Sequence, residues 1–530
     1  MRDFQLPGRS RAHARHGMAA TSHPLATLAA LDVLRAGGNA IDAAVAACAV
    51  QCVVEPQSTG IGGDCFALYS RGGSDDIVAY NGSGRAPAKA TVDVFEKLGI
   101  GAIDSLSPHA VTVPGAVDAW ERLTADHGTR TLGELLAPAI AYARDGYPVH
   151  DRVAGDWTRA GAAIGNDPST TALFMPGGRV PSPGALHHQP KLAATLERIA
   201  REGRDGFYKG PVAEDMVEHL NRRGGLHSLA DFTAAKGEYV TPIKARYRGL
   251  DIYECPPNGQ GLIALLLLNV LAGLEIKDRD PLSPERLHGV LEATRLAYAD
   301  RDAFLADPAH ADVPVRALLS PARADALRAR IRHDRRIDRL SPLPLPAHAD
   351  TVYISVVDKD RNAASFINSL FSSFGTGLMA PRSGVVLHNR GASFVVERGH
   401  PNCIAPGKRP LHTIIPGMVV AGGRAVMPFG VMGGHYQAMG HAWFLSNLLD
   451  FGLDLQEAID LPRLFPTLAG PVEVENGVPA ETVAALKRLG HTPVRPDRPI
   501  GGGQAIWIDW ETGVLTGASD PRKDGCALGY

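Results

Sequence analysis

The sequence pattern of this chain changes abruptly near residue 350. The stretch 346–358 reads PAHADTVYISVVD. Up to Asp350 the sequence is rich in proline and poor in helix and strand formers, which predicts an extended, exposed linker. From Thr351 onward it is apolar and β-branched, which predicts a buried strand. Any fold for this chain must therefore place a linker directly before a strand that begins with a threonine.

The two sides of this junction differ in their predicted secondary structure. Before it, apolar residues at three- and four-residue spacing predict helices over 24–56, 115–145, 190–222 and 285–335. After it, short apolar runs closed by glycine, aspartate or asparagine predict strands, among them 351–358, 363–371, 384–389, 413–420 and 505–510. With 530 residues, 45% of them hydrophobic, we expect two to four domains or one large layered unit. Sheets covered by helices would bury these strands on both faces.

Composition narrows the classes of partner. The formal charge is only −2 and the basic residues are scattered, which argues against nucleic acid or an anionic membrane as the main partner. The longest strongly apolar run, 262–274, is too short to span a bilayer. Six cysteines form no dense disulfide framework, and the first residues carry no secretory pattern. We therefore expect a cytoplasmic protein.

Several common catalytic motifs are absent from the sequence. It contains neither the phosphate-binding G-x-x-x-x-G-K-[ST] loop nor the G-x-S-x-G elbow of serine hydrolases. A metal-dependent amidohydrolase that uses His400, Cys403, His412 or His435 is an alternative. The irregular spacing of these four residues makes it the weaker one, and we expect no metal and no organic cofactor.

Thr351 has two interpretations. Inside a chain its hydroxyl is a poor nucleophile, and composition alone favours a residue that merely starts a strand. If the chain were cut between Asp350 and Thr351, the new α-amine would lie one carbon from the hydroxyl-bearing Cβ and act as its base. The linker would then become a tail that is free to leave the site.

Ordered motifs across nearly the whole chain decide between these interpretations. They are GMAATSHPLATLAALDVLRAGGNAIDAAVAA, VVEPQSTGIGGD, GRAPAKAT, VTVPGAV, PPNGQG, VMGGH and ASDPRKDGCALGY, together with the segment that starts at Asp350. In this order they resemble the γ-glutamyltranspeptidase family of N-terminal-nucleophile hydrolases. The resemblance implies an α+β fold, a four-layer αββα sandwich with two stacked antiparallel sheets. It also implies self-cleavage into a large subunit, 1–350, and a small subunit, 351–530, which together form one unit.

The resemblance assigns catalytic roles to four residues. Thr351 matches the nucleophile. Ser369 stands where the family usually has a second threonine whose hydroxyl contacts the nucleophile. Gly433 and Gly434 match the glycine pair whose N–H groups form the oxyanion hole, where a Cβ would obstruct the close approach of backbone to substrate.

The substrate-binding positions depart from the family pattern. Ser83 replaces the arginine that binds the glutamyl α-carboxylate, and Arg85 follows two residues later. Phe371 replaces an asparagine, which would narrow the pocket. Arg390 and Ser393 replace the glutamine and aspartate that hold the α-amino group.

A further departure concerns a serine pair of the family, which aligns with His412 and Thr413. Losing a carboxylate at 393 and gaining Arg390 disfavours a substrate ammonium. The planar guanidinium of Arg390, with that of Arg85, favours a carboxylate instead.

We therefore expect an amidohydrolase for a small carboxylate-bearing amide, foremost oxamate, which would give oxalate and ammonia in cytoplasmic purine breakdown. The alternatives are a γ-glutamyl transferase or glutathione hydrolase, a glutaryl-type cephalosporin acylase, and an unprocessed relative that only binds small acids. The expected partners are the anionic substrate and the two subunits of one precursor, without nucleic acid or membrane. A dimer of the processed heterodimer stays open, as does transfer to an amine instead of water.

Overall fold

The computed structural model describes residues 8–276, 280–338, 340, 350–467 and 470–530. Of the linker predicted over 340–350, the segment 341–349 lies outside the described residues. Strand β10 (Asp350–Val357) begins directly after it, and β11 (Ala363–Phe371) pairs antiparallel with β10, so both strands predicted there are confirmed. Helix α13 (Gly261–Leu271) accounts for the long apolar run, and all of its residues except Asn269 are buried.

Two large sheets form the centre of the molecule, and every strand pairing that the structure describes within them is antiparallel. The first sheet contains, from edge to edge, β19 (Ala527–Gly529), β2 (Met18–Ala20), β10, β11, β3 (Asp64–Ser70), β4 (Ile77–Gly82) and β7 (Glu238–Val240). The second contains β1 (Ala12–Ala14), β18 (Leu515–Ser519), β17 (Gly502–Ile508), β13 (Arg424–Met432), β12 (Gly417–Ala421), β9 (Leu250–Glu254) and β8 (Ile243–Tyr247). Each sheet combines strands from both sides of the 350/351 junction.

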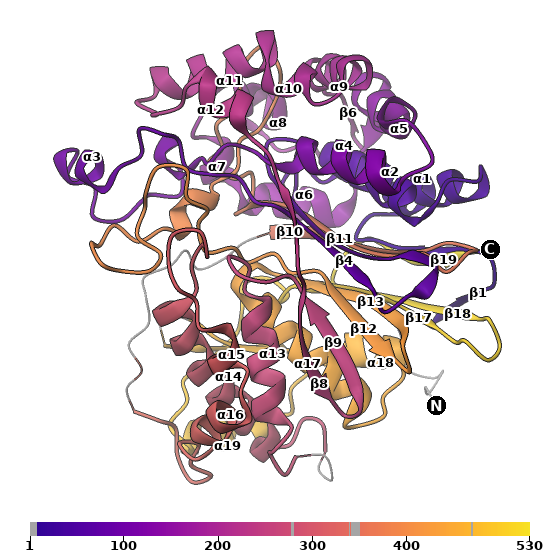
Figure 1. Cartoon of the computed structure of the whole chain (residues 1–530), viewed down its shortest axis with the longest axis vertical. Helices are drawn as coiled ribbons and strands as arrows, with labels where there is room; N and C mark the ends of the chain where they lie inside the picture. Colours follow the sequence, from indigo (N-terminus) through magenta and orange to yellow (C-terminus); the bar gives the residue numbers. More distant parts are fainter. Residues whose placement is uncertain (1–7, 277–279, 339, 341–349, 468–469) are drawn as a thin grey trace.

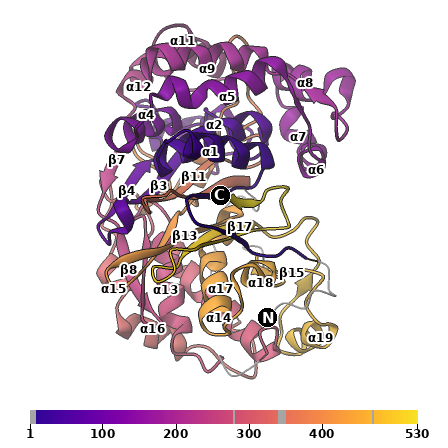
Figure 2. The same ribbon diagram turned by 90° about the vertical axis from the view of Figure 1, so that its right-hand side faces the viewer.

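Helices cover the outer face of each sheet, which completes four layers (Figures 1 and 2). The helices over the first sheet include α1 (Pro24–Arg35), α2 (Ala40–Val54), α4 (Ala116–His127), α5 (Leu132–Asp145), α6 (Asp151–Arg159), α8 (Pro168–Phe174), α9 (Pro190–Glu202), α11 (Gly210–Arg222) and α12 (Leu229–Ala234). Over the second sheet lie α13, α14 (Pro284–Phe304), α16 (Pro321–Arg328), α17 (Gln437–Leu449), α18 (Leu455–Asp460) and α19 (Ala480–Arg488). The predicted αββα architecture is confirmed.

Shorter elements connect these layers. They are α3 (Val92–Lys97), α7 (Gly161–Ile164), α10 (Asp205–Tyr208), α15 (Val315–Leu318), the strands β5 (Tyr147–Pro148), β6 (Leu186–His187), β14 (Leu464–Pro466), β15 (Val472–Val474) and β16 (Pro493–Val494), and the 3₁₀ turns η1 (Arg71–Gly73), η2 (Pro108–Ala110), η3 (Pro176–Gly178), η4 (Arg390–Ser393) and η5 (Gly434–Tyr436). The strand predicted over 384–389 was wrong: this stretch forms only isolated bridges, through Val386 and Leu387.

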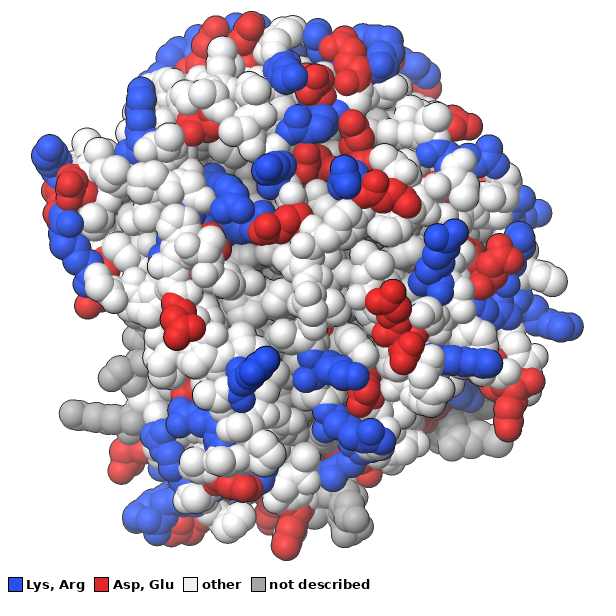
Figure 3. Space-filling view, in the orientation of Figure 1, with Lys and Arg blue, Asp and Glu red and all other residues white. Residues whose placement is uncertain are grey.

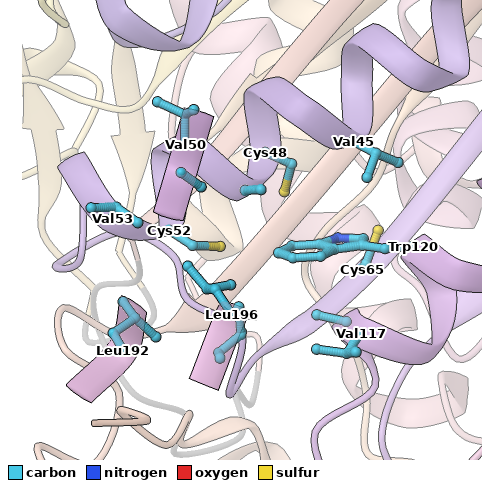
Figure 4. Packing of buried hydrophobic residues seen from close by; sticks show 14 of the residues in the cluster. Val45, Cys48, Val50, Cys52, Val53, Cys65, Val117, Trp120, Leu192 and Leu196 are labelled. Atoms are coloured by element: carbon cyan, nitrogen blue, oxygen red, sulfur yellow. The ribbon is translucent and has the colours of Figure 1, made fainter. Parts of the chain in front are cut away.

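Helix α2 is buried on all sides, because it lies between the first sheet and the outer helices. Its alanines, valines and cysteines allow this, since a helix that is apolar on most of its surface suits a position inside the core, and the buried Asp42 and Gln51 are hydrogen-bonded. Figure 4 shows Cys48 and Cys52 of this helix, and Cys65 of β3, around Trp120. The described cysteines are all unpaired thiols, and Cys48, Cys52, Cys65 and Cys255 are buried, where a free thiol packs as a small hydrophobic side chain.

Alternation along β10 determines which side chains face the second sheet. Ile354 and Val356 pack toward the helices, whereas Tyr353 and Val357 belong to the core between the sheets. The hydroxyl of Ser355 donates to the carbonyl of Pro428 on β13, 3.1 Å away. Because side chains alternate along a strand, Thr351 also faces the second sheet.

Candidate active site

A register irregularity at the start of β10 brings two hydroxyl groups together. Asp350 pairs with Phe371 and Val352 with Asn368, so β11 carries one extra residue opposite Thr351. The Oγ1 of Thr351 lies 3.1 Å from the Oγ of Ser369, and both residues are buried. The backbone N–H of Phe371 donates to the same serine oxygen over 2.9 Å, which fixes its position.

A third side chain reaches the Thr351 hydroxyl. Gln437, the first residue of α17, places its Nε2 at 3.4 Å from the Oγ1 of Thr351. Its Oε1 accepts from the backbone N–H of Ile415 at 3.1 Å, which orients the amide with its donor toward the threonine. Sequence reasoning missed this residue, although it stands three positions after the glycine pair.

The glycine pair forms the turn that joins β13 to η5 and α17. Gly433 has φ +121° and Gly434 has φ +57°, both in the region that favours glycine. A Cβ at Gly433 would lie 3.0 Å from the Cα of Gly501. The Nε2 of Gln260 donates to the carbonyl of Gly434 at 3.0 Å and holds the turn in place.

Thr351 and Gly433 open onto one cavity of about 940 Å³. Met432, Tyr436, Gly501 and Lys523 also line it. The structure thus places the expected nucleophile and Gly433 at one wall of a large cavity, with Ser369 in contact with Thr351 and Gly434 next to Gly433. This arrangement fits attack of a hydroxyl on a carbonyl whose oxygen would lie near backbone N–H groups.

Arg390 lies beneath this wall and does not line the cavity. It is fully buried, its guanidinium stacks at 4.1 Å on the ring of Phe371, and its Nη1 donates to the Oγ1 of Thr413 at 2.7 Å. Its Nε and Nη2 have no hydrogen-bond partner among the described residues. Burial lowers the pKa of Arg390 to about 9, and the nearby Asp64 offsets part of that shift.

Asp64 supplies the carboxylate of a buried polar cluster that also contains His388, Arg390 and His412. Its Oδ2 lies 2.9 Å from the Nε2 of His412 and 3.5 Å from the Nδ1 of His388, and its Oδ1 accepts from the N–H of Gly84 at 3.0 Å. Burial alone would raise the pKa of Asp64, but His388, His412 and Arg390 together lower it to about 2. Burial and the charge of Arg390 lower the pKa of His412 to about 3, so it donates to Asp64 as a neutral ring.

Of the two remaining predicted substrate-binding residues, Ser393 and Arg85, only the first lies in the same turn as Arg390. Ser393, in η4, is buried with no hydrogen-bond partner for its Oγ among the described residues. Arg85 is not brought together with the others. It lines a separate pocket of about 330 Å³, donates to the carbonyl of Gly407 and lies 3.7 Å from both Glu238 and Asp307.

The metal alternative gains no support from the side-chain arrangement. Among the residues that the structure describes, no three His, Cys, Asp or Glu side chains are grouped so that they could hold a metal ion. His412 is engaged with Asp64, and the Nδ1 of His400 accepts from the N–H of Asn402 at 3.0 Å.

No described helix is both long and apolar enough to cross a membrane. On the face shown in Figure 3, positive and negative side chains are interspersed.

The family model described as gamma-glutamyltranspeptidase matches residues 26–530. The chain belongs to this family. Two curated relatives are the "Glutathione hydrolase-like YwrD proenzyme" of Bacillus subtilis, 37% identical over 97% of this chain and 98% of the relative, and the "Oxamate amidohydrolase proenzyme" of Klebsiella pneumoniae, 35% identical over the same shares.

A solved structure of the same family, the cephalosporin acylase from Bacillus halodurans, superposes with a TM-score of 0.91 at 38% identity, covering 100% of this chain and 99% of the other. The chain is therefore an enzyme of the γ-glutamyltranspeptidase family with its αββα fold, as the motifs predicted.

Proposed function

We propose that this γ-glutamyltranspeptidase-family enzyme cleaves itself before Thr351 and then hydrolyses the amide bond of a carboxylate-bearing substrate. The observation that carries the proposal is the Thr351 hydroxyl, held by Ser369 and Gln437 at the wall of the cavity that Gly433 also lines. The two subunits would be 1–350 and 351–530, and both would stay in one fold because they share both sheets.

Maturation begins when the Oγ of Thr351 attacks the carbonyl carbon of Asp350. The bond between that carbon and the nitrogen of Thr351 breaks, the nitrogen takes the hydroxyl proton, and an ester links the two residues. The α-amine of Thr351 is then free, and water hydrolyses the ester, which leaves a carboxylate on Asp350 and frees the Thr351 hydroxyl.

In turnover the α-amine accepts the Oγ proton while Oγ attacks the substrate carbonyl. The N–H groups at Gly433 and Gly434 would hold the tetrahedral oxyanion. The leaving amine takes a proton and departs, and water hydrolyses the acyl-threonine. Fixed donors around Oγ favour this chemistry because they hold the nucleophile in one geometry.

Arg390 supports a substrate with an acid group. Two of its nitrogens lack partners among the described residues, and a carboxylate would satisfy both in a bidentate pair once the Phe371 ring moves aside. The same position disfavours a γ-glutamyl α-ammonium. Arg390 would repel it, and the carboxylate of Asp64 already bonds to His412 and to backbone N–H groups.

Oxamate is the first candidate, supported by the relative named for that activity and by the acid requirement. A larger acid-bearing amide is the second, because a molecule as small as oxamate would fill little of a 940 Å³ cavity.

The test compares the rates at which the processed enzyme hydrolyses oxamate, glutaryl amides and γ-glutamyl amides. Preference for γ-glutamyl amides would contradict our interpretation of Arg390 and Ser393.

A further inference from the structure

Lys523 lies beside the Gly433–Gly434 turn, within the terminal motif ASDPRKDGCALGY, although the sequence assigned this lysine no role. It follows β18, and its backbone N–H donates to the carbonyl of Asp520 at 3.1 Å. A Cβ on Gly502 would lie 3.0 Å from the Cγ and 3.3 Å from the Cε of Lys523. Gly502 pairs with Met432, the residue before Gly433. The lysine stem therefore runs across the strand pair that ends at the expected oxyanion site.

The charge of Lys523 is not matched by a contacting carboxylate. The residue is only 6% exposed, yet no hydrogen bond or ion pair joins its ammonium to any described residue. The other cations of the cavity wall differ in this respect. Arg152 and Arg159 both pair with Asp156, at 3.2 and 2.6 Å, and Arg498 also has a partner.

Glu55 is an acidic group that interacts electrostatically with Lys523, but it is a weak counter-charge. Its Oε2 already accepts from Ser22 at 2.6 Å and from Gln51 at 3.0 Å. Burial raises the pKa of Glu55 to about 7, although Lys523 acts in the opposite direction. An ammonium in such surroundings gains from an anion that enters the cavity and bonds to it.

Lys523 and Arg390 lie on different sides of Thr351. Arg390 stacks beneath Phe371 at the end of β11, on the first sheet, whereas Lys523 lies over β13 and β17 of the second sheet. With the amide carbonyl at Thr351, we expect the acid of the acyl group to reach Arg390. The other cation is then available to the part of the substrate that leaves.

We propose that Lys523 binds an anionic group on the leaving amine, so that the preferred substrate is an acid-bearing acyl group joined to an amine that itself carries a carboxylate, such as an amino acid. This proposal rests on the proposed amidohydrolase function, and within it favours the larger acid-bearing amide over oxamate. The bond broken is the amide C–N bond, and the products are a dicarboxylic acid and an amino acid instead of ammonia.

A matched substrate pair tests the proposal on the processed enzyme. Glutarylglycine and N-methylglutaramate share the acyl group, but only the first has a carboxylate on its leaving amine. In Lys523→Met we expect KM for glutarylglycine to rise about tenfold or more, with kcat and the constants for N-methylglutaramate little changed. Lys523→Arg should restore most of the affinity, and Lys359→Met, an exposed lysine on the loop after β10, is the control. Equal effects on both substrates, or none, would overturn the assignment.

Direct binding separates this inference from the function on which it rests. N-acetylglycine carries the amide and the glycine carboxylate but no acid on its acyl group. Calorimetry should show that it binds wild type about tenfold or more tightly than Lys523→Met. If no amide is turned over but this difference persists, the proposed function fails and the Lys523 site stands. If N-acetylglycine binds both proteins equally or neither, the site is refuted.

Discussion

At the scale of single residues, the Thr351 hydroxyl is fixed from two directions. Ser369 contacts it along the first sheet, and Gln437 contacts it from the helix that follows the Gly433–Gly434 turn. Both contacts are present in the uncleaved chain, so they bear on the proposed maturation as well as on turnover. The α-amine, in contrast, becomes available only after the Asp350–Thr351 bond is cut.

Replacing Ser369 tests the first contact. Ser369→Ala removes the hydroxyl, and we expect self-cleavage and kcat to fall roughly tenfold, as loss of a buried hydrogen bond of about 1–1.5 kcal/mol predicts. Ser369→Thr keeps the hydroxyl and should retain both rates within a few-fold. Gel time courses and kcat measure the two effects. Equal behaviour of the two variants would show that the hydroxyl is not needed.

Replacing Gln437 tests the second contact. Gln437→Glu keeps an oxygen for the N–H of Ile415 but loses the donor toward Thr351. We expect kcat to fall about 10- to 100-fold at neutral pH, with part of the loss recovered at lower pH, where a protonated carboxylic acid again donates. Unchanged kcat across the pH range would remove Gln437 from the site.

The sequence predicted those site residues that lie close together along the chain. Thr351 and Ser369 are 18 residues apart on one hairpin, so their contact follows from pairing β10 with β11. Gln437 and Lys523 come from the second sheet and its helices, and only the stacking of the sheets brings them to Thr351. No periodicity or spacing in the chain encodes that juxtaposition. For the same reason, Arg85 was grouped with Arg390 although it lies in another pocket.

At the scale of elements, the turn between β13 and α17 determines the geometry of the expected oxyanion site. Gly433→Ala would bring a Cβ within 3.0 Å of Gly501 and strain a φ of +121°. We expect kcat to fall about 100-fold or more, because the N–H groups of the turn are displaced.

The control for this prediction is Gly452→Ala. Gly452 also has a positive φ, +63°, but nothing lies within 4 Å of its added Cβ. It should lose some stability, roughly 1 kcal/mol, while kcat stays near that of wild type. Similar kcat values for both variants would argue against a special role for the turn.

Strand and helix prediction succeeded where burial and pattern agree. Strands β10, β11 and β17 and helices α4, α5, α9 and α11 lie where the sequence indicated. The stretch 384–389 is equally apolar, but it crosses between elements near Gly62 and Met379 and finds only isolated bridges. Its hydrophobic residues are buried by the surrounding loops and helices, which local sequence cannot distinguish from burial in a sheet.

At the scale of the whole molecule, burial of neutral histidines makes stability depend on pH. Burial, the largest cause in each case, lowers the pKa of His187 and His227 to about 4 and that of His412 and His491 to about 3. The unfolded chain, with histidine pKa values near 6.5, therefore binds more protons than the folded chain between about pH 6.5 and 4.

Stability should therefore fall as the pH drops through this window, by up to about 1.4 kcal/mol per pH unit for each such histidine. Urea unfolding of the uncleaved Thr351→Ala chain at pH 7.5, 6 and 5 measures the slope. His491→Gln should flatten it. A stability that is constant or rises toward pH 5 would contradict the neutral, buried state of these rings.

The shared sheets also explain why cleavage would leave the molecule intact. Strands β10 and β11 lie in the middle of the first sheet, between β2 and β3, so residues on both sides of residue 350 hold each other in place. A new terminus at Thr351 would stay fixed in the sheet by the pairing of β10 with β11.

The most direct test is the chemical identity of the chain after purification. Intact mass and N-terminal sequencing of wild type should reveal two chains, one of which begins Thr351-Val352-Tyr353. Thr351→Ala should remain one full-length, inactive chain, and Thr233→Ala, on the exposed surface of α12, should be processed normally. A wild-type protein that hydrolyses amides as a single uncut chain would contradict the N-terminal threonine mechanism.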